Sequence, residues 1–258
     1  MHLTVPPSHD PVCATSSNAK LAVGFASTRE EVREVQRLRY EVFSKTFNAS
    51  TLVNPEALNV DGYDDYCDHL VVRDTATSRI VGTYRMMGPK AAQRMGHYYA
   101  EKEFDLSRLA SLRPCLVEAG HACVHPDYRS GSVIMMLWSA LALYMQRTGC
   151  EYLMGCVSVS VSDGGHTAAS LYHAFTSDNF APAQYRVSPY KPFPVHAREA
   201  GAAVRTPPLL KGYLRSGGWV CGEPALDLEF NSADFFMLLP LSNLDRRYAR
   251  HYLKTDTS

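Results

Sequence analysis

The sequence predicts an α+β domain with a mixed, mostly antiparallel central sheet flanked by helices. Strand-like and helix-like runs alternate along the 258 residues, and two strand-like runs, at 67–73 and 79–87, are separated only by a polar stretch of hairpin length. No repeat, low-complexity block or change of composition divides the chain. We therefore expect residues 20–258 to form one domain with one shared sheet. The proline-containing residues 1–19 are expected to be a flexible tail.

Local patterns predict the elements of the first half. Thr28, with Glu31 three residues later, forms a capping box for a helix that should end near Phe43. Turn-forming residues predict a long loop over 44–66, of a kind that often carries function. The other elements expected in this half are a strand over 21–26, the hairpin strands at 67–73 and 79–87, and a helix over 91–104.

The second half opens with a strand over 116–124, a turn over 125–131 and an apolar helix over 133–145. The apolar run is short for a membrane span, and strand-like segments flank it, so we expect a core helix. A strand over 152–159 completes a β-turn-α-β unit. The remaining elements expected are a helix over 166–176, an irregular loop over 181–208 with one short strand, and a strand over 235–239.

Charge and cysteine content exclude several classes of function. Lys plus Arg and Asp plus Glu both number 26, so no global positive field exists and we expect no nucleic-acid partner. The seven cysteines form no C-x-x-C pair and no cluster with histidines, which argues against a metal site and favours a reducing compartment. No cysteine has an assigned base partner, so thiol catalysis is not expected.

The turn before the apolar helix predicts a phosphate site, because backbone N–H groups are free at a helix N-terminus and Arg129 can add a charged contact. A plain structural connection explains the pattern equally well. The segment Ala122–Arg129 resembles the donor strand and pyrophosphate loop of the GCN5-related N-acyltransferase (GNAT) superfamily, which implies a GNAT-like fold. Ser132 and Ile134 replace two small residues of that loop, which favours a carrier protein with one phosphate over coenzyme A. The resemblance implies acyl-donor contacts from Cys123, Val124, Arg129, Ser130, Gly131 and Ser132.

A second pattern consists of charged residues upstream of that turn and within its strand: Arg39, Asp65, Asp68, Arg85 and Glu118. Arg39 lies on the apolar stripe of the first helix, where an unpaired guanidinium would be costly, and Glu118 interrupts an apolar strand. Each alone is more often structural. Together they resemble the pattern of acyl-homoserine-lactone synthases, with His121 where those usually have arginine. Strict alternation turns Glu118 and His121 to opposite faces, and a bulge at Gly120 would turn both to one cleft.

The most extensive resemblance is carried by short segments between Leu38 and Leu253. They are Arg39–Phe43, Asp65–Leu70, Gly82–Arg85, Phe104–Ser107, Cys123–Arg129, Cys221–Pro224, Ala233–Phe235 and Arg247–His251. The chain is similar in these segments to the ornithine N-acyltransferases of ornithine-lipid synthesis. That resemblance implies a single N-acyltransferase domain that moves a 3-hydroxy fatty acyl group from acyl carrier protein to the α-amino group of ornithine. Phosphopantetheine then arrives on the carrier, and no other cofactor is expected.

The resemblance also implies roles for residues. Glu118 is the base or the carboxylate that orients the amine, and a strand ion pair with Arg85 is the structural alternative. Tyr172 is the general acid, or else a packing tyrosine. Asp65 and Asp68 attract the cationic end of ornithine, a backbone N–H near Cys123 or Val124 polarises the carbonyl, and the α-carboxylate meets Arg39, Arg85 or His121.

Alternatives to this function remain open. One is a synthase of another N-acyl amino acid or of an acyl-homoserine-lactone-type signal, and another is a non-catalytic lipid-binding or hemolysin-like protein. Arg246, Arg247, Arg250 and Lys254 are candidates for docking an acidic carrier protein, although a solvated terminal helix explains them as well. A lipid product implies transient membrane contact, so we expect a cytoplasmic protein, peripheral at most at the inner face of the membrane.

Overall fold

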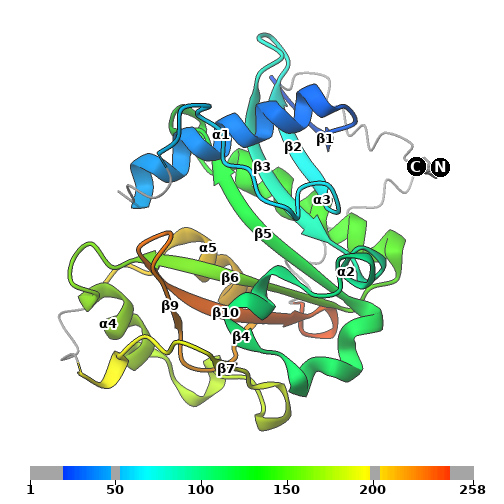
Figure 1. Ribbon diagram of the computed structural model, residues 1–258. Coiled ribbons are helices and arrows are strands. Elements are labelled where there is room, and N and C mark those ends of the chain that lie inside the picture. The colour runs from blue at the N-terminus through cyan, green and yellow to red at the C-terminus, as the bar shows by residue number, and fades with distance from the viewer. Residues whose placement is uncertain (1–19, 48–52, 198–203, 245–258) are drawn as a thin grey trace.

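The computed structural model describes residues 20–47, 53–197 and 204–244, and one mixed sheet runs through them (Figure 1). Its strand order is β1-β2-β3-β5-β6-β10-β8, with β9 paired to β10, and every neighbouring pair is antiparallel except β5 with β6. The predicted mixed, mostly antiparallel sheet is therefore confirmed. The strands are β1 Leu21–Phe25, β2 Asp68–Asp74, β3 Ile80–Met87, β5 Leu116–Val124, β6 Tyr152–Ser160, β8 Trp219–Val220, β9 Ala225–Asp227 and β10 Ser232–Pro240, and a separate two-stranded sheet pairs β4 Phe104–Asp105 with β7 Ser188–Pro189.

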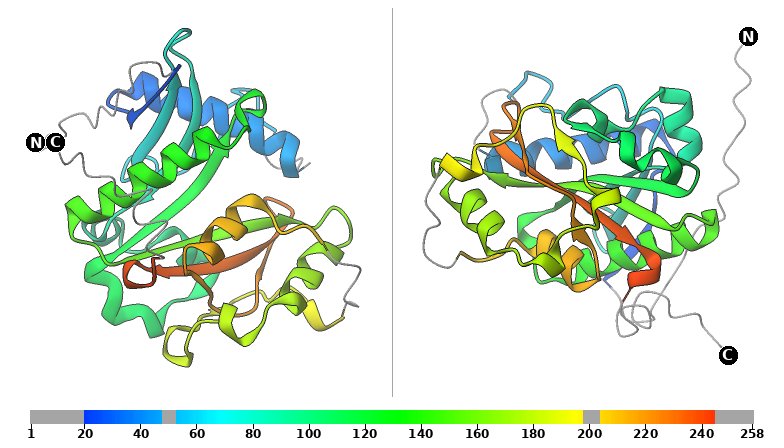
Figure 2. Two further views of the ribbon diagram at one scale, coloured as in Figure 1. Left: turned by 180° about the vertical axis from the view of Figure 1, so that it is seen from behind. Right: turned by 90° about the horizontal axis from the view of Figure 1, so that it is seen from below.

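Helices cover both faces of this sheet. Figures 1 and 2 show α1 and α3 on opposite faces of its N-terminal half, and α5 on the same side as α3 over the C-terminal half. The apolar side of α3, including Leu137, Trp138 and Leu141, is buried in the main core, as predicted. Among the described residues, no helix has the length and hydropathy that crossing a bilayer requires. The α-helices are α1 Arg29–Phe47, α2 Pro89–Met95, α3 Ser132–Thr148, α4 His166–Ala174 and α5 Pro208–Arg215.

Two segments differ from the sequence prediction. The helix expected over 91–104 is broken, because α2 ends at Gly96, which has a left-handed φ of 94°, and only a 3₁₀ turn over Tyr99–Lys102 follows before β4. The helix α5 was not predicted, since paired prolines suggest a loop. Pro208 is nevertheless the first residue of α5, a position where its missing N–H costs nothing. The expected tail at 1–19 and the basic cluster from Arg246 to Lys254 lie outside the described residues.

The parallel strands β5 and β6 diverge, and this divergence positions the site. Their ladder ends at the pair Glu118–Met154, while β5 stays paired with β3 as far as Val124. Gly155 stands at the vertex, where a Cβ atom would lie 2.3 Å from the carbonyl oxygen of Ala119, so only glycine allows this approach. Beyond the vertex the two strands separate into a wedge (Figures 1 and 2).

Candidate active site

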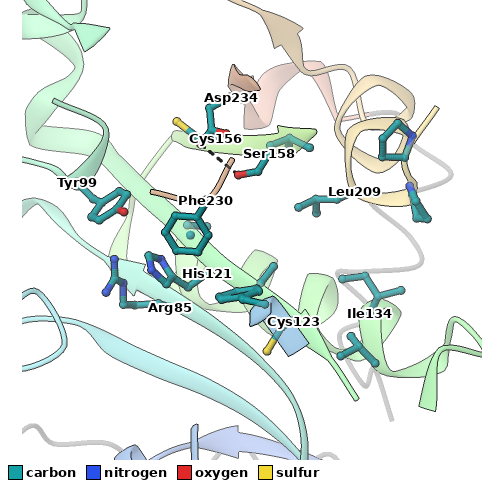
Figure 3. A pocket seen from close by; sticks show the side chains of 18 of the residues that line it. Arg85, Tyr99, His121, Cys123, Ile134, Cys156, Ser158, Leu209, Phe230 and Asp234 are labelled. Carbon is teal, nitrogen blue, oxygen red and sulfur yellow. Dashed lines mark hydrogen bonds between the residues drawn. The ribbon is translucent and has the colours of Figure 1, made fainter. Parts of the chain in front are cut away.

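A cavity of about 400 Å³ occupies the wedge (Figure 3). One wall is β5 from Glu118 to Val124, and the others come from β3, β6, β9 and β10, the end of α1 and the starts of α3 and α5. Polar side chains, including Arg85 and Asp234, line the cavity from two sides. Phe43 and Phe230 line the cavity where they pack against the ring of His121, and Ile134 and Leu209 line its far side from Arg85 (Figure 3).

A bulge in β5 gathers the polar side chains. The register with β3 changes between the pairs Thr83–Cys123 and Arg85–Gly120, so the bulged strand has one residue more than its partner. His121 takes the left-handed conformation there, with φ 53°. The bulge expected near Gly120 is therefore present, one residue later, and it brings both Glu118 and His121 to the cavity wall.

Glu118 is the buried acid of the site. Its carboxylate is held rigidly, because its two oxygens accept the backbone N–H groups of Tyr99 and Ala100, each at 2.7 Å. Burial raises the pKa of Glu118 to about 7 despite these hydrogen bonds. A carboxyl group with such a pKa can both take up and release a proton near neutral pH. The strand ion pair with Arg85 is not formed, since Arg85 binds other acids.

Arg85 is anchored in the cavity wall by Asp61 and Asp64, whose carboxylate oxygens lie 2.6 and 3.0 Å from its Nη1. The guanidinium also lies over the rings of Tyr63 and Tyr99, 5.6 and 5.1 Å from their centroids. These contacts fix one edge of the guanidinium and leave the side chain lining the cavity. Arg85 is thus a positioned cation that can bind a carboxylate.

Arg39 lies behind this arrangement and not in the cavity wall. It is completely buried and binds Asp64 through two hydrogen bonds of 2.9 and 2.6 Å, with a third to the carbonyl oxygen of Asn59. Burial alone would raise the pKa of Asp64, but the hydrogen bonds and charge of Arg39, with the charge of Arg85, lower it to about 2. The expected substrate contact of Arg39 is therefore replaced by a supporting role, in which Arg39 holds the acid that holds Arg85.

The two acids expected to bind the amine substrate do not line the cavity. Asp65 is exposed, and Asp68 accepts a hydrogen bond of 2.9 Å from the hydroxyl of Tyr144. The acids that bind Arg85 are instead Asp61 and Asp64, in the loop that precedes β2. Sequence reasoning missed them because the loop has no period from which the direction of a side chain can be read.

His121 has a different environment from the one expected. Its Nε2 lies 3.7 Å from a carboxylate oxygen of Asp61, and its ring meets those of Tyr99 and Phe43 edge to face. Burial, followed by the charges of Arg85 and Arg39, lowers the pKa of His121 well below its usual value. The imidazole is then neutral at pH 7. It can donate or accept a hydrogen bond there, but it does not supply the positive charge expected for the carboxylate of a substrate.

Tyr172, the expected general acid, lies outside the cavity. It is on α4, which follows β6 and packs against the turn over Val195–Ala197. Its ring contacts the rings of Phe180 and His196. Because β6 has diverged from β5 before α4 begins, this tyrosine is carried away from the β5 wall, and the packing alternative describes it.

The end of β5 and the turn that follows it line the cavity near Ile134. Cys123, Val124, Arg129 and Gly131 line it, while Ser130 and Ser132 are exposed. Gly131 precedes α3 with φ 102°, and Arg129 donates from Nε to the carbonyl oxygen of Val124 at 3.2 Å. Burial raises the pKa of the Cys123 thiol to about 12, so this thiol stays neutral.

The N–H of Val124 faces the wedge. His125 donates its N–H to the carbonyl oxygen of Val81 at 2.9 Å, which places the backbone groups of His125 on the β3 side. Directions alternate along an antiparallel strand, so Cys123 also points its N–H to β3 while Val124 points its N–H to the open edge. The backbone N–H groups of Cys123 and Val124 were the two donors expected to polarise the carbonyl of the acyl donor. Only the N–H of Val124 points toward the cavity.

A further acidic group was missed by sequence reasoning. Asp227 and Asp234 line the cavity, and Glu103 lies beside them, with one carboxylate oxygen of each within 4.8 Å of the others. Asp234 is 5% exposed, and its oxygens accept the hydroxyls of Ser232 and Ser158 at 2.7 and 3.1 Å. The three acids are far apart in the sequence, which therefore gave no sign that they meet.

Comparisons with known proteins show what this chain is similar to. Residues 38–139 match the Acetyltransferase (GNAT) domain family. The chain is 31% identical to the L-ornithine N(alpha)-acyltransferase of Brucella abortus (strain 2308), over 90% of this chain and 88% of the relative. The enzyme of the same name from Rhizobium meliloti (strain 1021) is 32% identical, over 91% and 84%.

Solved structures with a similar fold have low sequence identity. One is a CoA-dependent acyl-homoserine lactone synthase, BjaI, with SAM and isopentyl-CoA, at 18% identity and a TM-score of 0.49 over 87% of this chain and 81% of that one. Another is FeeM, an N-acyl amino acid synthase from uncultured soil microbes, at 10% identity and a TM-score of 0.46 over 88% and 94%.

Proposed function

This chain belongs to the family of L-ornithine N(alpha)-acyltransferases, and we propose that it transfers a fatty acyl group from acyl carrier protein to the α-amino group of ornithine. One observation supports this most strongly: the cavity joins a buried carboxyl group, Glu118, to the open edge of β5 at Val124. Amide formation needs a proton acceptor beside the amine and a donor beside the carbonyl oxygen, and the two lie on one strand.

The amine end of the reaction uses Glu118 and Arg85. An α-amino group has a pKa of about 8 in model peptides, so most of it is protonated at pH 7 and must lose a proton before attack. Glu118, whose pKa is about 7, accepts that proton directly or through a water molecule. Arg85 binds the α-carboxylate of ornithine, which fixes the amine beside Glu118.

The donor end uses β5. The thioester carbonyl is placed against the N–H of Val124, which stabilises the oxyanion that develops when the amine attacks. As the C–N bond forms and the C–S bond breaks, the nitrogen loses a second proton. One of the two protons passes by way of Glu118 to the leaving thiolate, and the other is released to water. The acyl chain extends along the apolar side chains of the cavity, among them Ile134 and Leu209.

The segment around α3 favours acyl carrier protein as the donor over coenzyme A. A bound coenzyme A presents a pyrophosphate, whereas phosphopantetheine on a carrier presents one phosphate. Here Arg129 supplies a single guanidinium, and the side chains of Ser132 and Ile134 occupy positions that would be small in a pyrophosphate cradle. No other cofactor is then needed. The lipid product would bring the enzyme into transient contact with a membrane.

The test is a product assay by mass spectrometry. Purified protein is given 3-hydroxyacyl carrier protein, or the matching coenzyme A thioester, with an equimolar panel of ornithine, lysine, glycine, glutamine and homoserine. We expect N-acyl ornithine from the carrier-bound donor. A clear preference for coenzyme A would overturn the donor assignment, a product on another amine would overturn the acceptor, and no product with any pair would overturn the activity.

A further inference from the structure

We propose that Glu103, Asp227 and Asp234, here called the acidic cluster, bind the side-chain ammonium group of the acceptor amino acid and so select a cationic side chain. This inference rests on the proposed function and deepens it, because it names the part of the cavity that distinguishes ornithine from a neutral amino acid. The three carboxylates come from the segment before β4, from β9 and from β10.

The cluster lacks a positive charge of its own. Arg39 pairs with Asp64, and Arg85 pairs with Asp61 and Asp64. Within the described part of the chain, no ion pair joins a basic side chain to Glu103, Asp227 or Asp234. The ammonium group of Lys102 lies instead over the rings of Tyr63 and Tyr99, 4.6 and 4.7 Å from their centroids. Three acids this close together, of which Asp234 is buried and the other two are partly buried, repel one another unless they bind protons or a cation.

An unused hydrogen-bond acceptor points to a ligand. The Oε2 atom of Glu103 exposes less than 1 Å² and has no hydrogen-bond partner in the described residues, which is unusual for a buried oxygen. Burial, then the charges of Asp234 and Asp227, raises the pKa of Glu103 to about 9, and burial raises that of Asp234 to about 7. A donor carrying a positive charge would both satisfy the oxygen and relieve the repulsion.

The position of the cluster fits a substrate with two amino groups. Asp227 and Asp234 line the same cavity as Glu118, and the thiol of Cys156 lies within electrostatic reach of all three and of Glu103. Figure 3 shows Asp234 next to Cys156, across the cavity from Arg85 and His121. A short amino acid whose α-carboxylate meets Arg85 and whose α-amine meets Glu118 therefore extends its side chain toward the cluster.

The chemistry of the cluster favours an ammonium group. A primary ammonium has three N–H donors and can serve three separate acceptors, one on each carboxylate. A neutral alkyl end in the same place would leave the Oε2 atom of Glu103 without a partner and the repulsion among the three acids unrelieved, a mismatch that sites of this kind reject strongly. Three carboxylates can also bind a divalent cation. Treatment with a chelator distinguishes a bound metal from a bound ammonium group.

The experiment compares ornithine with norvaline, which is ornithine without its side-chain amine. Wild type, Asp234→Asn and Glu103→Gln are assayed for kcat/KM on each acceptor, with Glu151→Gln, an exposed acid outside the cavity, as the control. We expect wild type and the control to prefer ornithine by on the order of 100-fold or more. Each cluster variant should lose about 10- to 100-fold on ornithine, the effect of a charge-assisted hydrogen bond, and keep its rate on norvaline.

The possible results distinguish a failure of the acidic cluster as an ammonium site from a failure of the proposed acyltransferase activity. A variant that merely folds badly would lose both acceptors alike, so an equal loss contradicts the assignment. Wild type that acylates ornithine and norvaline equally would overturn the acidic cluster as a selectivity site but leave the acyltransferase intact. If wild type acylates no amino acid, the proposed function itself fails. Loss of ornithine turnover with a chelator, restored by Mg²⁺ or Mn²⁺, would assign the cluster to a metal and overturn the ammonium site.

Discussion

The pKa values of two acids of the site are shifted in opposite directions because the surroundings of the two acids differ. Asp64 meets two guanidinium groups, which outweigh its burial and lower its pKa to about 2. Glu118 is buried with only two backbone N–H partners, and its pKa rises to about 7. By linkage, Asp64 contributes stability above pH 3.8 that is lost as the pH falls toward 2. Glu118 acts oppositely, since its stabilising protonated form is lost as the pH rises from 4.5 through 7.

The pKa of Glu118 sets an expected pH dependence of turnover. If Glu118 is the base, kcat should rise with pH and level off above about 7, falling about tenfold per pH unit below it. kcat is measured with saturating ornithine, because free ornithine also titrates and distorts kcat/KM. Glu118→Gln should remove this rise together with most of the activity. A variant that keeps both the rate and the rise would place the base elsewhere.

The Arg39–Asp64 pair is expected to contribute mainly to stability. Arg39→Met leaves the Asp64 carboxylate buried without its main partner, a change that costs about 3–5 kcal/mol of unfolding free energy. Arg79→Met is the matched control, since its pair with Glu41 is half exposed and worth at most about 1 kcal/mol. Urea unfolding measures both. Equal losses in the two variants would contradict the supporting role of Arg39.

At the residue scale, sequence reasoning found the charges but not their partners. Arg39 on an apolar stripe was a candidate to bind the carboxylate of the substrate, and it binds the carboxylate of Asp64 instead. Glu118 in an apolar strand reaches the cavity as expected. Asp234 was beyond prediction, because its meeting with Glu103 depends on how β10 pairs with β6 and on where β4 lies.

At the scale of elements, the site depends on one vertex and one bulge. Gly155 lets β6 touch β5 at Ala119, and beyond that point the strands separate. The bulge at His121 then turns two side chains into the same opening. The strand β5 itself was predicted with its observed bounds, 116–124, and the bulge was foreseen from the conflict between Glu118 and His121. The divergence could not be foreseen, since it depends on contacts between strands.

The vertex gives an expected difference between two glycine substitutions. Gly155→Ala places a Cβ atom 2.3 Å from a backbone oxygen, so one strand must move, and overpacking of this kind costs about 1–3 kcal/mol. Gly24→Ala in β1 is the control, because nothing lies within 4 Å of its added Cβ. Thermal unfolding should show a lower Tm for Gly155→Ala only, accompanied by reduced activity. Equal Tm values would mean that the vertex tolerates a side chain.

At the scale of the whole molecule, the wedge brings together segments from both ends of the sheet. The polar wall combines β3 and β5 with β10, and the apolar wall combines the starts of α3 and α5. Figure 3 shows Ile134 and Leu209 on the opposite side of the cavity from Arg85 and Tyr99. The proposed function therefore gives the acceptor and the acyl chain separate regions, which meet at the centre of β5. The sequence predicted the sheet and its helices, but α5 was missed, and with it one wall of the apolar region.

This separation gives an expected change in acyl-chain preference. Ile134→Trp adds bulk to the apolar region at the start of α3 without touching the polar wall, so it should favour shorter acyl chains and leave the KM for ornithine unchanged. Each methylene that can no longer be buried costs about 0.8 kcal/mol, roughly fourfold in kcat/KM, so a chain obstructed over two or three methylenes should lose about 10- to 100-fold.

The measurement is kcat/KM for a series of acyl carrier protein thioesters that differ in chain length. Arg147→Trp, at the exposed end of the same helix, controls for the effect of a tryptophan on α3 and should keep the wild-type preference. If Ile134→Trp instead raised the KM for ornithine and left the chain preference unchanged, Ile134 would belong to the acceptor region. The acyl chain would then have to leave the cavity by another side, because α3 and α5 would no longer form its wall.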